Sequence, residues 1–275
     1  MLVSPHGAGV EAPSTPATLT PTATVKTHFA KSHCSRCHLR AWCMPGDPAN
    51  ARVDCMDSLM FSRRRIRAGE RLYRTGETFS CLFEIRSGTL KSSLSTAHGK
   101  ERVSAFHMAG ELVGLDGIAD GHHASSATAL EDTEVCAASY AMVTALAESN
   151  ASLQRTLLQE LSRESVRELH LLVRFGSLSS ERRLATFLLN LSQRLSARGY
   201  SPSEFRMRMS RSDIASYLGL TVETVCRNFS AFQKLGILEV DQRHVRISDL
   251  GGLTRISDLD TPKAPRARRR GLPTS

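Results

Sequence analysis

Residues 210–236 read SRSDIASYLGLTVETVCRNFSAFQKLG, and this stretch decides the fold of the C-terminal part of the chain. Ser210 stands three positions before Asp213, which is the pattern of a capping box that begins a short helix. Gly219 supplies a tight turn, and Thr221 is a good N-terminal cap for the next helix. Two helices joined by a short glycine turn predict a helix-turn-helix, the motif whose second helix enters the major groove of DNA.

The second helix of this stretch has an inner and an outer face. Val222, Val225, Phe229 and Phe232 recur at helical spacing, and we expect them to point inward. The opposite face carries a carboxylate, a thiol, a guanidinium and a hydroxyl at spacings of three and four. Arginine donates twice to guanine and glutamate accepts from cytosine, so this face suits DNA. The predicted DNA-binding residues are Glu223, Cys226, Arg227 and Ser230.

The residues that follow predict a wing. Residues 237–240 and 245–247 read as strands, and the polar residues 241–244 between them read as a turn. The alternative is an ordinary helical hairpin with an exposed glutamate and arginine. Agreement of cap, turn, outer face and wing favours the winged helix-turn-helix.

Upstream, the pattern changes twice. From about residue 59 to residue 140, short apolar runs alternate with glycine turns, which predicts a β-sandwich, roll or barrel. Leu82–Ile85 and Thr89–Leu94 read as two of its strands. From about residue 142 to residue 175 the apolar spacing becomes that of a long helix.

This helix carries two apolar stripes. One alternates steps of three and four, as in a coiled-coil seam, and the other could pack on the β domain. Because the seam has two polar members, the alternative is a face that is simply solvated. The seam consists of Leu158, Leu161, Ser165, Glu168 and Leu172, and the second stripe of Leu153, Leu157, Val166, Leu169 and Val173.

Cysteines are the second informative feature. Three of them crowd residues 33–43 (HCSRCHLRAWC), and Cys136 stands far downstream. Thiolates are soft ligands that suit iron–sulfur clusters or zinc, and the segment alone does not decide between them. For zinc, Cys55 would be the fourth ligand, and His33 and His38 are further donors. A thiol oxidoreductase using Cys34 and Cys37 is a third reading, but that chemistry needs a βαβ context that is missing here.

Composition sets the remaining bounds. The chain has 275 residues, 41% of them hydrophobic, with a net charge of +9 and a pI of about 9.5, which favours a polyanionic partner. We see no signal peptide and no apolar run of membrane length, so we expect a cytoplasmic protein. In that reducing compartment, clustered cysteines more often bind metal than form disulfides.

At this point the chain resembles the FNR branch of the CRP/FNR transcription regulators, from about residue 33 to residue 250. The resemblance implies an α+β fold: a cyclic-nucleotide-binding-like β-roll, a long dimerisation helix and a C-terminal winged helix-turn-helix. The resemblance also implies that a homodimer binds a TTGAT-type inverted repeat and that RNA polymerase is a partner. It implies no enzymatic activity. The matching stretches are IRSGT at 85–89, FHMAGELVG at 106–114, ALE at 129–131 and YLGLTVET at 217–224.

The same resemblance assigns residues. It implies a 4Fe–4S cluster that senses oxygen and promotes dimerisation, with Cys34, Cys37, Cys43 and Cys136 as its ligands. It implies base reading by Glu223 and Arg227, and the seam as the dimer interface. The chain departs from the family where Cys226 replaces a serine, where Glu168 replaces an aspartate, and at His38, where a small residue is common. Cys55 and Cys81 are left as spare or buried thiols.

A ligand of the cyclic-nucleotide class is the remaining alternative within this fold. Binding a cyclic phosphate requires an arginine and backbone amides in the β-roll. The corresponding residues 121–127 (GHHASSA) contain no arginine, which argues against a cyclic-nucleotide ligand.

The predicted division of the chain is as follows: residues 1–30 are disordered, 31–57 bind the cluster, 58–145 form the β-roll, 146–178 the dimerisation helix, 179–250 the winged helix-turn-helix and 251–275 a basic disordered tail.

Overall fold

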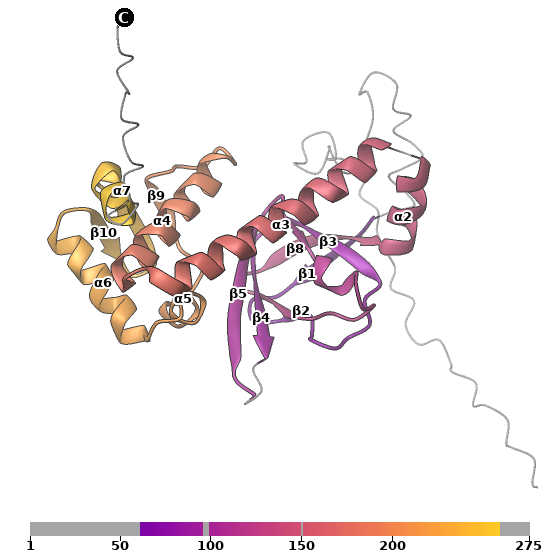
Figure 1. Cartoon of the computed structure of the whole chain (residues 1–275), viewed down its shortest axis with the longest axis horizontal. Coiled ribbons are helices and arrows are strands. Elements are labelled where there is room, and N and C mark those ends of the chain that lie inside the picture. The colour runs from indigo at the N-terminus through magenta and orange to yellow at the C-terminus, as the bar shows by residue number, and fades with distance from the viewer. Residues whose placement is uncertain (1–60, 96–98, 150, 259–275) are drawn as a thin grey trace, which may run out of the picture. The chain divides into compact units, whose positions relative to one another are not determined.

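The computed structural model describes residues 61–95, 99–149 and 151–258 (Figure 1). The predicted cluster-binding segment, residues 31–57, lies outside them, as do residues 1–30 and 259–275. Within the described ranges, no helix is long and apolar enough to cross a membrane.

The N-terminal half forms two antiparallel four-stranded sheets (Figure 1). One sheet has the order β1-β8-β3-β6 and the other the order β2-β7-β4-β5. The strands predicted at Leu82–Ile85 and Thr89–Leu94 lie within β3 and β4, so those predictions are confirmed. The strands are β1 (Phe61–Ile66), β2 (Arg71–Tyr73), β3 (Cys81–Ser87), β4 (Thr89–Ser95), β5 (Glu101–Met108), β6 (Leu112–Val113), β7 (Ser126–Ala129) and β8 (Thr133–Ser139).

The interior of this β-roll is apolar, with side chains from both sheets. Ile85, Leu90 and Val135 are completely buried there. The turn between β3 and β4 needs Gly88, whose φ is +94°. A Cβ at this position would come within 2.8 Å of the Thr133 Cα, so a larger residue would push this turn away from the start of β8. A short 3₁₀ turn, η2 (Leu115–Gly117), follows β6.

Helices α2 (Tyr140–Ser149) and α3 (Ala151–Ser177) follow β8. Val143 of α2 and Leu157 of α3 pack with Leu82 and Ala138 on the outer face of the first sheet. The prediction that the whole second stripe packs on the β domain is wrong. Leu153 is buried, but Val166 and Leu169 are 45% and 57% exposed.

The spacing explains this correction. Leu169 lies eleven residues after Leu158, which is three helical turns, so the two side chains share one face. Leu158 is 61% exposed and Leu161 is 37% exposed. The apolar face that α3 leaves uncovered therefore includes Leu169 in addition to the predicted seam residues Leu158 and Leu161.

The C-terminal half is a winged helix-turn-helix, as predicted. Its three-stranded sheet has the order β10-β11-β9. Residues Glu204–Arg206 pair with β11 as the third strand of this sheet. The elements are α4 (Ser180–Ser196), β9 (Glu204–Arg206), α5 (Arg211–Leu218), α6 (Val222–Lys234), β10 (Leu238–Asp241), β11 (His244–Ile247) and α7 (Leu250–Asp258).

Helix α7 corrects the prediction that a disordered tail begins at residue 251. Leu253 is completely buried, and α7 packs against α4. The buried Arg182 of α4 donates from Nε and Nη2 to the carbonyl of Ser257, at 3.3 and 3.2 Å. A cation at the C-terminal end of a helix is stabilising, which helps to explain why the chain stays helical here.

The local signals of the helix-turn-helix are confirmed. Ser210 and Asp213 form the capping box at α5, Gly219 ends α5 in the left-handed conformation, and Thr221 caps α6. Val225 is completely buried, as predicted, but Val222 is 45% exposed. Val222 is the first residue of α6, where the side chain lies beyond the edge of the core.

The capping box should contribute measurably to stability. Ser210 Oγ accepts a hydrogen bond from the Asp213 amide at 3.0 Å, so Ser210→Ala leaves that amide without its cap. We expect a loss of about 1 kcal/mol of unfolding free energy, measured by urea denaturation. The exposed Ser212, two positions later, is the matched control. Ser212→Ala should be neutral or slightly stabilising, because alanine favours helix. Equal effects of both changes would contradict the capping role.

Candidate DNA-binding face and cluster-ligand site

Helix α6 presents the predicted DNA-binding residues on one surface. Its inner face is fixed by Val225, Phe229 and Phe232, which are at most 3% exposed. Because the inner face is anchored, the outer residues project outward from a rigid base. All four predicted DNA-binding residues are exposed: Glu223, Cys226, Arg227 and Ser230.

The surroundings of this face add an arginine that sequence reasoning missed. The Arg211 guanidinium carbon, from the start of α5, lies 3.6 Å from the centre of the Phe229 ring of α6. Burial is the main effect on Arg211, and it lowers the pKa of the guanidinium from its ordinary value. Cys226 on the outer face is near enough to act on it electrostatically. No periodicity marks Arg211, because its contact joins two different helices.

Cys136 lies on the outer face of the first sheet. Side chains alternate along a strand, and its neighbours Val135 and Ala137 point into the β-roll interior. Cys136 therefore shares the outer face with Ala138, which packs with Leu157 of α3. Only 7% of Cys136 is exposed.

The cross-strand neighbours of Cys136 differ in charge and burial. In the antiparallel register it pairs with Arg63 of β1 on one side and Glu84 of β3 on the other. Directly paired residues face the same side of a sheet, with Cβ atoms roughly 5 Å apart. Arg63 is exposed, whereas Glu84 is only 3% exposed.

Glu84 is the unusual group of this site. Its Oε1 is buried and has no hydrogen-bond partner among the residues that the structure describes. Burial, and secondarily the carboxylate of Glu160 on α3, raise the pKa of Glu84 to about 8. The side chain is therefore mostly neutral at pH 7, and it does not repel a negatively charged group bound at Cys136. Sequence reasoning missed Glu84, which reads as an ordinary strand residue.

The structure places only part of the predicted ligand set. Cys34, Cys37 and Cys43 lie outside the described residues, as does Cys55 of the zinc alternative. Across residues 61–258, wherever the chain is described, no group of three or more His, Cys, Asp and Glu could hold a metal ion. A buried thiol beside an arginine and a neutral carboxyl fits a thiolate-bound cluster, with the other ligands supplied from elsewhere.

The region expected to receive a cyclic phosphate is filled by its own side chains. Asp116 Oδ2 accepts hydrogen bonds from the Ser125 amide at 2.8 Å and the Ser125 hydroxyl at 2.7 Å. His123, which is 4% exposed, lies 3.4 Å from Asp116 and stacks on Tyr73 with ring centres 3.7 Å apart. A carboxylate already holds a backbone amide that a phosphate would need, which argues against a cyclic nucleotide.

The predicted dimer interface is described in part. Leu158, Leu161 and Ser165 are exposed on α3. Glu168 and Leu172 belong to the same helix, but the structure does not describe their side chains. Leu169 is exposed in the same way as Leu158 and Leu161 and adds to the apolar surface of this face.

Comparison with known proteins agrees with this architecture. A Cyclic nucleotide-binding domain matches residues 63–150, and a Crp-like helix-turn-helix domain matches residues 182–256. The chain is 44% identical to the Transcriptional regulatory protein btr of Bordetella pertussis, over 82% of this chain and 93% of that protein. It is 36% identical to the Anaerobic regulatory protein of Haemophilus influenzae, over 84% and 90% of the two chains. It is similar in structure to FixK2 from Bradyrhizobium japonicum, with a TM-score of 0.67 and 27% identity over 72% and 98%.

Proposed function

The chain belongs to the CRP/FNR family of transcription regulators, and on that premise we propose that it binds DNA as a homodimer when oxygen is low. The observation that carries DNA binding is the exposed outer face of α6, held on a buried core and followed by a wing. The response to oxygen is supported by the name of the relative from Haemophilus influenzae. A regulator of this kind acts on transcription through RNA polymerase.

We propose Cys34, Cys37, Cys43 and Cys136 as the ligands of a 4Fe–4S cluster. The buried Cys136, flanked by Arg63 and the neutral Glu84, supports this assignment. A zinc site built from the N-terminal segment alone would leave Cys136 without a role. The cluster, when bound, supplies a centre that oxygen destroys.

The residues of this chain suggest how ligand binding at Cys136 reaches the dimer. Binding would hold the N-terminal cysteine segment against β8, on the face of the sheet where Leu157 of α3 packs. Glu84, the neighbour of Cys136 across the strands, is influenced by Glu160 of the same helix. A bound ligand at Cys136 would therefore favour one arrangement of α3, the one in which the seams of two protomers pack together.

We propose that each protomer inserts α6 into one half of a TTGAT-type inverted repeat. A two-fold dimer places its two reading helices about 34 Å apart, one turn of DNA. Glu223 and Arg227 would contact base edges, since both are exposed on the same face. Cys226 stands between them, and a thiol is a weak hydrogen-bonding group, so its contribution would be mainly apolar.

The test is Arg227→Ala. We expect a loss of about 1–3 kcal/mol in specific binding, concentrated at the guanine of each half-site. Fluorescence anisotropy with the repeat and with single-base variants, under nitrogen, measures both effects. Arg74→Ala removes an equal charge from the β-roll, where Arg74 is paired with Glu77, and should bind like wild type. If the affinity fell equally for every DNA sequence, Arg227 would instead contact a backbone phosphate.

A further inference from the structure

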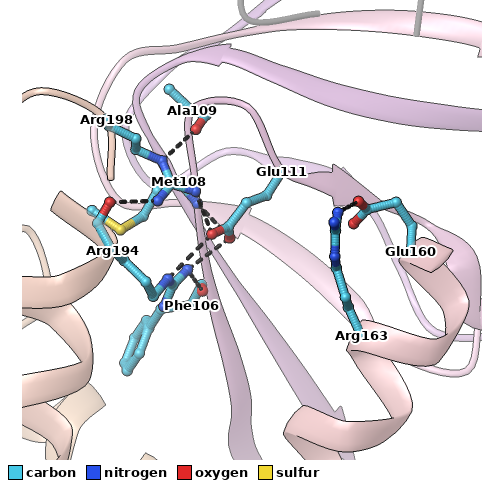
Figure 2. A network of polar contacts seen from close by, with 8 residues as sticks. All are labelled: Phe106, Met108, Ala109, Glu111, Glu160, Arg163, Arg194 and Arg198. Carbon is cyan, nitrogen blue, oxygen red and sulfur yellow. Dashed lines mark hydrogen bonds and ion pairs between the residues drawn. The ribbon is translucent and has the colours of Figure 1, made fainter. Parts of the chain in front are cut away.

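Glu111, between β5 and β6, is a buried carboxylate held by two arginines from the helix-turn-helix part of the chain. Figure 2 shows Arg194 and Arg198 converging on it. Arg194 Nη2 donates to Oε2 at 2.6 Å and Nε to Oε1 at 3.2 Å, and Arg198 Nη2 donates to Oε1 at 2.5 Å. Glu111 is 6% exposed. A two-pronged arginine–carboxylate pair fixes orientation as well as distance.

The same guanidinium groups also bind the backbone of the β-roll. Arg194 Nη2 donates to the Phe106 carbonyl at 2.7 Å, and Arg198 Nε donates to the Ala109 carbonyl at 2.6 Å (Figure 2). Glu111 Oε2 accepts from the Met108 amide at 3.1 Å. The two arginines therefore contact both the Glu111 carboxylate and the backbone of the β-roll beside it, and Glu111 itself is held by the Met108 amide.

Further contacts join the same two parts of the chain. Lys91 of β4 pairs with Asp213 of α5 at 2.6 Å, and the Val103 amide of β5 donates to Ser216 Oγ at 2.9 Å. Phe106 of β5 belongs to the apolar core of the helix-turn-helix, and its ring centre lies 5.1 Å from that of Tyr217. The β4–β5 hairpin is thus bound to α5 by ionic, polar and apolar contacts together.

We propose that Glu111 is a positioning residue that fixes each helix-turn-helix on its own β-roll and so sets the half-site spacing that the dimer accepts. This inference rests on the proposed function. One added base pair moves a half-site by about 3.4 Å and rotates it by roughly 35° around the DNA axis. A dimer whose two reading heads are both fixed to rigid bodies cannot follow that change, whereas a dimer with loosened heads can.

The experiment uses the full chain, purified and assayed under nitrogen. Binding is measured by fluorescence anisotropy to inverted repeats whose centres are shortened by one base pair, optimal, or lengthened by one or two. Relative to the optimal repeat, wild type should bind each shifted repeat about 100-fold more weakly. Glu111→Gln should lose less than about fivefold in affinity for the same shifted repeats. Glu111→Asp, which keeps the charge, should restore most of the discrimination.

Glu101→Gln is the matched control, because the ion pair of Glu101 with Arg71 lies within the β-roll. It should keep the wild-type spacing preference. If Glu111→Gln fails to fold, as judged by circular dichroism, Arg198→Gln can be used in its place. It removes the ion pair with Glu111 by changing the arginine, whose side chain is 16% exposed. Folded variants that discriminate spacing as sharply as wild type would overturn the inference. If wild type bound none of the repeats, the proposed function itself would fail, and this inference with it.

Discussion

Cys136→Ala should abolish the visible chromophore of protein purified under nitrogen, with loss of bound iron and sulfide. The thiol is buried on the outer face of β8, between Arg63 and Glu84, and no other described cysteine occupies that face beside it. Alanine fills most of the space but offers no soft donor, so the proposed cluster would lose a ligand that the fold cannot replace. Absorption spectra with iron and sulfide analysis measure the effect.

Cys81→Ala is the control for this change. Cys81 is half-buried at the start of β3, where it pairs with Ser139, and the proposal gives it no part in the cluster. The variant should keep the full chromophore. Cys34→Ala, Cys37→Ala and Cys43→Ala should each behave like Cys136→Ala. Zinc bound in stoichiometric amount, with no iron, in protein purified under nitrogen would contradict the cluster.

The sequence was most informative where signals are local. Ser210, Asp213 and Gly219 predicted the helix-turn-helix because caps and tight turns involve residues three or four apart. The strands at Leu82–Ile85 and Thr89–Leu94 followed from short apolar runs and Gly88. In both regions the local preference and the tertiary packing agree, and the prediction is confirmed.

Prediction failed where packing alone decides. Val166 and Leu169 read as part of a stripe facing the β domain, but both are exposed, whereas Leu157 nearer the start of α3 packs there. The first residues of the predicted disordered C-terminal tail instead form helix α7, because Leu253 is completely buried and α7 packs against α4. Periodicity reports that a face is apolar, and it does not report which neighbour covers it.

Two features of the candidate sites had no sequence signal. Glu84 becomes unusual through its burial beside Cys136 and near Glu160 of α3, and Glu111 through arginines more than 80 residues away. Each residue looks like an ordinary exposed acid at the end or middle of a strand pattern. Their roles arise from contacts between distant segments, so a structure was needed to find them.

Glu168→Leu should convert the protein into a dimer that persists in air. The uncovered face of α3 carries Leu158, Leu161 and Leu169, with Ser165 and Glu168 interrupting it in sequence. Two Glu168 carboxylates meeting across a two-fold axis would repel each other and lose hydration. Wild-type protein should therefore be dimeric with its cluster and mainly monomeric without it. When the free energies of monomer and dimer are nearly equal, the small contribution of the bound cluster is enough to shift the equilibrium.

The expected size of the change follows from burial. Two leucines in place of two glutamates would each gain roughly 1.5 kcal/mol or more when buried, and the repulsion would also disappear. A total of about 3 kcal/mol strengthens dimerisation roughly 100-fold. Sedimentation in air, with a gel shift on the inverted repeat, measures dimerisation and DNA binding in the same samples.

Gln159→Leu provides the matched control for this substitution. Gln159 is an exposed residue of α3 that lies nine residues before Glu168, on the opposite side of the helix. It adds the same apolar side chain away from the seam and should leave the air-exposed protein monomeric. If Glu168→Leu also stayed monomeric in air, or if wild-type protein without its cluster were already a tight dimer, this seam could not be the element through which oxygen controls DNA binding.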